Sequence, residues 1–70
     1  MTDATVRVWP QDLSAVGYCH RGARRFFRRH ALDWPAFLRT GIAADRLLAT
    51  GDYMAERLVA QARGRHEHKA

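Results

Sequence analysis

Five arginines lie close together between positions 18 and 30, and their spacing predicts one basic face on a helix. At about 100° per residue they fall within an arc of roughly 140°. The five residues, called the arginine face below, are Arg21, Arg24, Arg25, Arg28 and Arg29. No acidic residue lies between Asp12 and Asp33 to neutralise them. Because like charges repel and guanidinium groups pair with phosphates and carboxylates, the pattern favours binding of an anionic partner.

Two other interpretations of this segment stay open. Tyr18 lies at the edge of the same helical face, so it is a further candidate contact, with a place in the core as the alternative. Eleven of the twelve basic residues are arginine, a bias that a GC-rich genome also produces, so an ordinary solvated helix face is the alternative for the arginines. The arrangement of the charges is therefore stronger evidence than their total.

The cysteine and the histidines do not predict a metal site. Cys19 and His30 lie about three helical turns apart, or about 16 Å, and cannot share an ion. His66 and His68 fall in a polar tail, where two ligands alone make a poor site. We expect Cys19 to be buried in the core, and we expect neither a metal nor another cofactor.

Catalysis is not predicted either. Neighbouring residues on a helix point about 100° apart, so Cys19 and His20 do not face each other. A chain of 70 residues is too small for both a core and a deep cleft. The carboxylates are explained by roles as helix caps or surface charges: Asp33, Asp45, Asp52 and Glu56. We expect no catalytic residue and no enzyme.

The N-terminal half reads as an extended arm followed by two helices. Residues 5–9 alternate as a strand would, but no second strand is evident, so we expect an arm that packs Val6, Val8 or Trp9 on the helices. Pro10 begins a short helix that Gly17 stops. The basic helix covers residues 18–30, and Gly22 inside it would permit close approach of another backbone.

The C-terminal half reads as three more helices. Asp33 is a good N-cap, Pro35 suits the first turn, and Gly41 ends that helix, which carries Trp34, Phe37 and Leu38. A short helix over residues 43–49 ends at Thr50-Gly51-Asp52. The last helix presents an inner face and ends at Gly64; that face comprises Tyr53, Met54, Leu58 and Val59.

These elements predict an all-α fold, a small orthogonal bundle of four or five short helices with an extended N-terminal arm. We expect one domain over residues 1–64 and a polar tail over residues 65–70. The net charge of +5 and pI near 10.7 favour acidic partners. The single cysteine, the lack of a long apolar run and the lack of a signal peptide predict a cytoplasmic protein that does not enter a membrane.

Known DNA-binding motifs fit the sequence poorly. A helix-turn-helix needs a small residue four positions before its glycine and an apolar residue six positions after it. Phe37, Leu13 and Leu47 stand at the first position for Gly41, Gly17 and Gly51, respectively, and none of them is small. A helix-hairpin-helix over residues 38–43 lacks its second glycine, because Ala43 stands there.

One pattern of residues extends over most of the chain: Cys19, Arg21 to Arg24, Phe26, His30, Leu32 to Trp34, Phe37, Leu38, Gly41, Ile42 and Ala49 to Asp52. With this pattern the chain from Leu13 to Ala62 resembles short accessory proteins encoded by phages and prophages. Arg21 and Arg24 belong to this pattern, whereas Arg25, Arg28 and Arg29 extend it. The resemblance implies a stoichiometric binder, such as an inhibitor of a host defence complex, a transcription modulator or a small assembly factor.

The arginine face and the resemblance together lead to one functional expectation. We expect an inhibitor of a host nucleic-acid-handling defence complex, of the anti-CRISPR type, acting in the bacterial cytoplasm. Its partner would be a host protein or nucleoprotein complex with an acidic or phosphate surface. Two alternatives stay open: direct, phosphate-directed binding of DNA or RNA, and a small virion assembly factor. The oligomeric state is left open.

Overall fold

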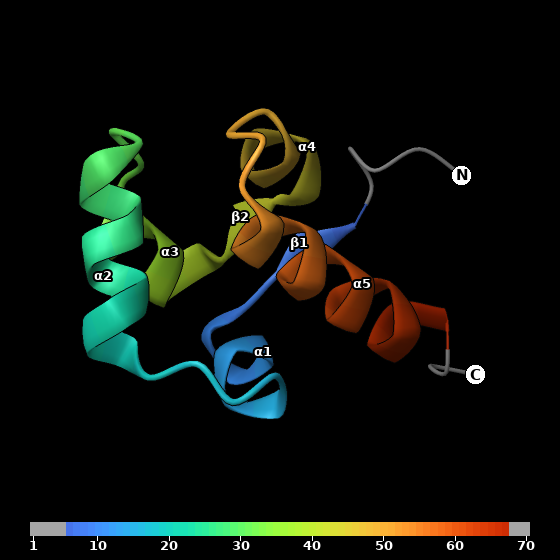
Figure 1. Ribbon diagram of the computed structural model, residues 1–70. Helices are drawn as coiled ribbons and strands as arrows, with labels where there is room; N and C mark the ends of the chain where they lie inside the picture. The colour runs from blue at the N-terminus through green and yellow to red at the C-terminus, as the bar shows by residue number, and fades with distance from the viewer. Residues whose placement is uncertain (1–5, 68–70) are drawn as a thin grey trace.

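The computed structural model describes residues 6–67, with side chains as far as Arg65, and contains five helices and a two-stranded sheet (Figure 1). The elements in chain order are β1 (Arg7–Val8), α1 (Pro10–Ala15), α2 (His20–Arg29), α3 (Trp34–Thr40), β2 (Ile42–Ala43), α4 (Ala44–Leu48) and α5 (Tyr53–Glu67). The prediction of a small, mainly helical fold with four or five short helices is confirmed.

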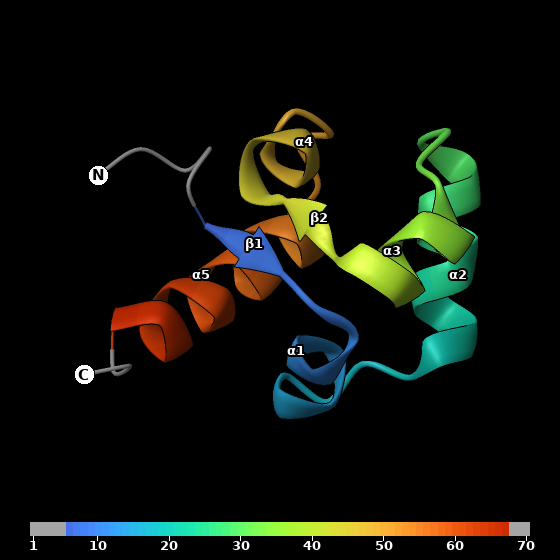
Figure 2. The same ribbon diagram turned by 180° about the vertical axis from the view of Figure 1, so that it is seen from behind.

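The N-terminal arm is a strand, and the expectation that it had no partner is wrong. β1 pairs antiparallel with β2, with Arg7 opposite Ala43 and Val8 opposite Ile42. The Arg7 side chain adds a hydrogen bond from Nε to the carbonyl oxygen of Thr40 (2.6 Å). Figure 2 shows the two strands side by side between α4 and α5. The alternation over residues 5–9 indicated β1, but β2 has only two residues and gives no alternation by which the partner strand could be identified.

Gly41 makes this pairing possible. Its φ of 72° lets the chain turn out of α3 directly into β2, a conformation that favours glycine. A Cβ at this position would lie 2.7 Å from the carbonyl oxygen of Val8. The two strands therefore approach each other at a point where a side chain does not fit.

The variant Gly41→Ala is expected to lose about 1–3 kcal/mol of unfolding free energy from backbone strain alone, with the clash at Val8 adding to that loss. Chemical denaturation followed by circular dichroism measures it. Gly51→Ala is the matched control, because Gly51 also has a positive φ of 71° but nothing within 4 Å of its Cβ position. Equal losses in the two variants would show that the close approach to Val8 is unimportant.

The core lies where α5 crosses β1 and packs against α1 and α4 (Figures 1 and 2). Its largest fully buried apolar side chains are Phe27, Phe37, Leu13, Leu47, Leu58, Val8 and Val59. An aromatic cluster joins α2 to α3: the Phe27 ring lies 4.7 Å from that of Phe37 and 5.2 Å from that of Trp34, between centroids. The cluster fixes the orientation of α2 and so decides which of its faces meets solvent.

The helix starts follow the predicted caps, with one difference. The Asp33 carboxylate accepts the backbone N–H of Ala36 at 2.9 Å. The Asp52 carboxylate accepts that of Met54 at the same distance. Cys19, expected in the core, is instead exposed at the N-cap of α2, where its Sγ accepts the Gly22 N–H at 3.3 Å. Gly22 approaches no other backbone, because only this sulfur lies within 4 Å of its Cβ position.

Helix α5 begins where predicted, at Tyr53, but differs from the prediction in one inner-face residue and in its C-terminal end. Tyr53, expected on the inner face, is 71% exposed, whereas Leu58 and Val59 are buried as predicted and Met54 is partly buried. The helix does not end at Gly64 but continues to Glu67. The remainder of the predicted tail, residues 68–70, lies outside the described part of the chain.

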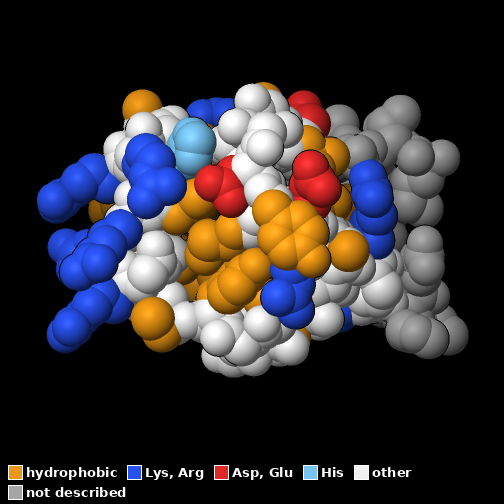
Figure 3. All heavy atoms as spheres, viewed as in Figure 1, with side chains coloured by type: hydrophobic (Ala, Val, Ile, Leu, Met, Phe, Trp, Pro, Cys, Tyr) orange, Lys and Arg blue, Asp and Glu red, His pale blue; other side chains and the backbone are white. Residues whose placement is uncertain are grey.

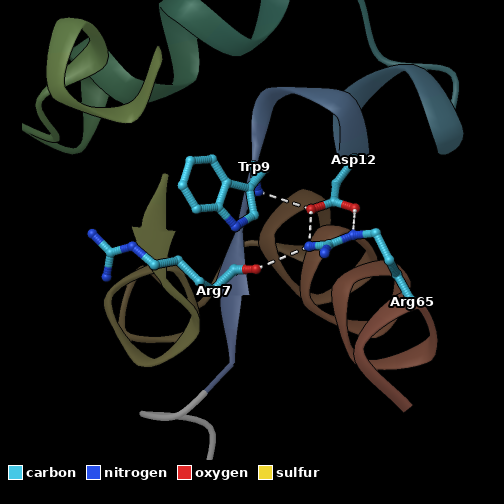
Figure 4. Close-up of polar contacts among 4 residues, drawn as sticks. All are labelled: Arg7, Trp9, Asp12 and Arg65. Carbon is cyan, nitrogen blue, oxygen red and sulfur yellow. Dashed lines mark hydrogen bonds and ion pairs between the residues drawn. The ribbon is translucent and has the colours of Figure 1, made fainter. Parts of the chain in front are cut away.

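An ion pair between the buried Asp12 and the partly exposed Arg65 holds this end of α5 in place (Figure 4). The Asp12 carboxylate is fully buried and accepts two hydrogen bonds from the Arg65 guanidinium, each 2.9 Å, and one from the Trp9 backbone N–H. Arg65 also donates to the carbonyl oxygen of Arg7. The hydrogen bonds to Asp12 raise the pKa of Arg65, and the charge of Asp12 adds to this while burial opposes it. The pair links α1, β1 and α5.

Replacing Arg65 with alanine is expected to lower the unfolding free energy by about 1.5–3 kcal/mol, because the Asp12 carboxylate would stay buried without its charged partner. Thermal denaturation measures this loss. Arg39→Ala removes the same charge from an exposed position and is expected to be nearly neutral. If both variants melted at the same temperature, the pair would be unimportant for stability.

Candidate anion-binding surface

All five residues of the arginine face are exposed on α2, as their spacing predicts. The opposite side of the helix carries the buried residues Ala23, Phe26 and Phe27. Basic side chains project along the outer edge of the molecule formed by α2, at the left of Figure 3. The helix therefore divides into an apolar side that packs on the core and a basic side that meets solvent.

The arginine face is not neutralised within the described chain. None of its five side chains forms a hydrogen bond or an ion pair with another residue of the described range. The acidic groups near α2 serve elsewhere: Asp33 caps α3, and Asp52 lies 3.9 Å from Nε2 of His30. Five like charges on one short helix repel one another, and an anionic ligand would relieve that repulsion.

Two shallow hollows adjoin on this surface. Arg21, Arg24, Arg25 and Arg28 line the first, of about 310 Å³. The second, of about 370 Å³, lies between α2 and α3 and shares Arg21 and Arg24 with the first; its other lining residues are His20, Trp34 and Leu38. The surface thus combines a purely cationic part with a part that has aromatic and aliphatic walls.

Tyr18 lies just before α2, outside the helix that carries the arginine face. It precedes the Cys19 N-cap and packs, partly buried, against the core. The guanidinium of Arg57, on α5, lies 5.7 Å from the centroid of its ring. These contacts agree with the core alternative, so the surface argued below does not include Tyr18.

The cysteine and histidines are separated by the fold. Cys19 and His30 flank opposite ends of α2. The His20 ring contacts the Trp34 ring edge-to-face, with 5.9 Å between centroids. The centroid of the His30 ring lies 4.7 Å from that of Phe26. Within the described range, no group of three or more histidine, cysteine, aspartate or glutamate residues could hold a metal ion. The side chains of His66 and His68 lie outside that range.

The sequence reasoning did not find the hollow between α2 and α3. Trp34 and Leu38 are four positions apart and so share a face of α3, which the sequence could have indicated. Their position beside Arg21 and Arg24 depends on how α3 packs against α2, which no local pattern predicts. In this packing, the Leu38 side chain is 46% exposed to solvent.

Known proteins give no further guide to this surface. The chain matches no family model, no curated protein and no solved structure. Among the described helices, none combines the length and the apolar character needed to cross a membrane.

Proposed function

We propose that this protein is a non-enzymatic, stoichiometric binder that docks through the arginine face onto the phosphates of a nucleic acid, either free or held in a host nucleoprotein complex. One observation carries the proposal: the five exposed guanidinium groups of α2 have no carboxylate partner among the described residues. Guanidinium groups bind phosphate oxygens bidentately, and such contacts supply most of the affinity in sequence-independent binding.

Phosphates suit this surface better than the carboxylates of a protein partner. Every exposed residue of α2 is arginine, histidine or glycine. The buried centre of a stable protein interface is usually apolar and poor in charge, whereas nucleic-acid interfaces are strongly positive. Among the residues whose side chains the structure describes, Leu38 is the one exposed large apolar side chain beside the arginine face. That area is far smaller than a standard protein interface requires.

The biological role we propose is inhibition of a nucleic-acid-guided defence complex in the bacterial cytoplasm, as in anti-CRISPR proteins. Support for this role comes from the resemblance to phage accessory proteins and from the charge of the surface. A basic protein does not mimic DNA, and the nucleic-acid channels of such complexes are themselves basic. The inhibitor would therefore bind phosphates of the guide RNA that the complex leaves accessible.

The test is a titration of fluorescently labelled DNA and RNA, single- and double-stranded, over a series of salt concentrations. If all five arginines neutralise phosphates, the logarithmic salt slope should be about −3.5 for a single strand and about −4.5 for a duplex. Affinity would then fall by about 100- to 500-fold between 50 and 200 mM salt. Absence of binding at 50 mM salt, or an affinity that does not change with salt concentration, would contradict the proposal.

A further inference from the structure

The hollow between α2 and α3 combines aromatic, aliphatic and cationic side chains. His20 is exposed at the start of α2, Trp34 begins α3, and Leu38 follows one turn later. These three side chains form the aromatic and aliphatic walls of the hollow, and Arg21 and Arg24 line the rest. A nucleobase offers a flat ring to stack on such walls and carries its phosphate nearby.

The walls of the hollow are held in place by the core. The Trp34 ring lies 5.2 Å from that of Phe27 and 5.4 Å from that of Phe37, between centroids. His20 in turn contacts Trp34 edge-to-face, with an angle of 82° between the rings. Because Trp34 is already packed, a ligand would not have to order it, and preorganisation of this kind strengthens binding.

The cationic and apolar parts of the surface meet at two residues. Arg21 and Arg24 line both hollows, so a phosphate bound there would lie between the cationic hollow and the apolar one. In a duplex the bases are stacked and paired inside the helix and cannot reach such a hollow. A single strand can turn a base outward and stack it on a protein ring while its phosphates meet arginines.

We propose that the hollow lined by His20, Trp34 and Leu38 receives an unpaired nucleobase, so that the ligand of the arginine face is single-stranded nucleic acid. This inference rests on the proposed function and narrows it from phosphates in general to unpaired strands. Stacking on protein rings tolerates every base, so the site selects for single strands without selecting a sequence.

The experiment compares three labelled ligands of equal length: a single strand, the matched duplex and a single strand of abasic sites. A length of about 12 nucleotides falls within the usual range of small single-strand-binding folds. The abasic strand keeps the phosphates and lacks the bases. We expect the intact strand to bind about tenfold more tightly than the abasic strand, the change typical of one stacked base.

Two variants test whether the hollow causes the tighter binding of the intact strand. His20→Ala and Leu38→Ala each remove an exposed wall, and we expect each to lower the affinity for the intact strand toward that of the abasic strand. Tyr53→Ala is the matched control, because it removes a 71% exposed aromatic side chain that does not line the hollow. The control should keep the full preference for the intact strand.

Three results would overturn the inference while leaving the proposed function standing: equal affinity for the intact and abasic strands, tighter binding of the duplex, or an unchanged preference in both hollow variants. Failure to bind any of the three ligands would instead overturn the proposed function. The two failures are therefore distinguishable in one set of titrations.

Discussion

Replacing Phe27 with alanine is expected to leave much of the protein unfolded at room temperature. Phe27 is fully buried, and its ring contacts those of Phe26, Trp34 and Phe37. Removing a buried phenylalanine ring costs about 3–5 kcal/mol. A domain of this size has a total unfolding free energy not much larger than that. The substitution would therefore remove most of the stability that keeps the protein folded.

Thermal unfolding followed by circular dichroism measures this effect. Tyr53→Ala is the control, because Tyr53 is the most exposed large hydrophobic side chain described and its loss should shift the melting temperature little. Phe37→Ala should behave like Phe27→Ala, since Phe37 is 1% exposed in the same cluster. A Phe27→Ala protein that melted cooperatively within a few degrees of the unsubstituted chain would contradict the packing that orients the arginine face.

Reversing two charges, in the double variant Arg24→Glu/Arg28→Glu, is expected to weaken nucleic-acid binding by about 100-fold or more near 0.1 M salt. Each lost phosphate contact means that fewer counterions are released from the nucleic acid on binding, which weakens the affinity. The new carboxylates also repel the phosphates of the strand. The salt slope should fall by about 2, one unit for each contact. Fluorescence anisotropy over the same salt series measures both quantities.

A second double variant distinguishes the effect of the arginine face from the effect of the net charge. Arg39→Glu/Arg46→Glu changes the net charge equally, but these exposed arginines lie on α3 and α4. Neither arginine lines either hollow of the surface, so this control should lose less than about tenfold in affinity at physiological salt. Equal losses in the two double variants would mean that the protein binds through its overall charge and has no dedicated surface. Early melting of Arg24→Glu/Arg28→Glu would mean that the arginines are structural.

The sequence predicts those features that depend on neighbours along the chain. Asp33 and Asp52 cap helices because their side chains reach backbone N–H groups two or three residues away. Glycine ends α1 and α3 at positions with positive φ, Gly17 and Gly41. The exposure of the arginine face follows from the 3.6-residue period alone, because the opposite side of the helix is apolar.

Features that depend on distant residues were missed. The β1–β2 pair joins Val8 to Ile42, and the two residues of β2 are too few to identify it as the partner strand. Arg65 and Asp12 are 53 positions apart, so an arginine in a polar tail gave no sign that it would pair with a buried carboxylate. One local feature was missed as well: Cys19 has the character of a small apolar residue inside the predicted helix, but the helix begins one residue later and the Cys19 sulfur caps it through the Gly22 N–H.

The candidate site divides in the same way. The arginine face is local and was predicted residue by residue, whereas the adjoining hollow requires α3 to lie against α2. Trp34 was expected in the core and is partly buried there, yet it also lines the hollow with Leu38. A residue that serves the core and a surface site at once cannot be recognised from its type and spacing.

Mapping the bound surface by nuclear magnetic resonance tests the central claim most directly. A ¹⁵N-labelled sample would be titrated with an unlabelled oligonucleotide while backbone amide signals are followed. We predict saturable shifts concentrated in α2 and at the start of α3, with little change around Tyr53 on α5. Shifts concentrated elsewhere on the fold, or no shifts at all, would contradict the assignment of the arginine face as the binding surface.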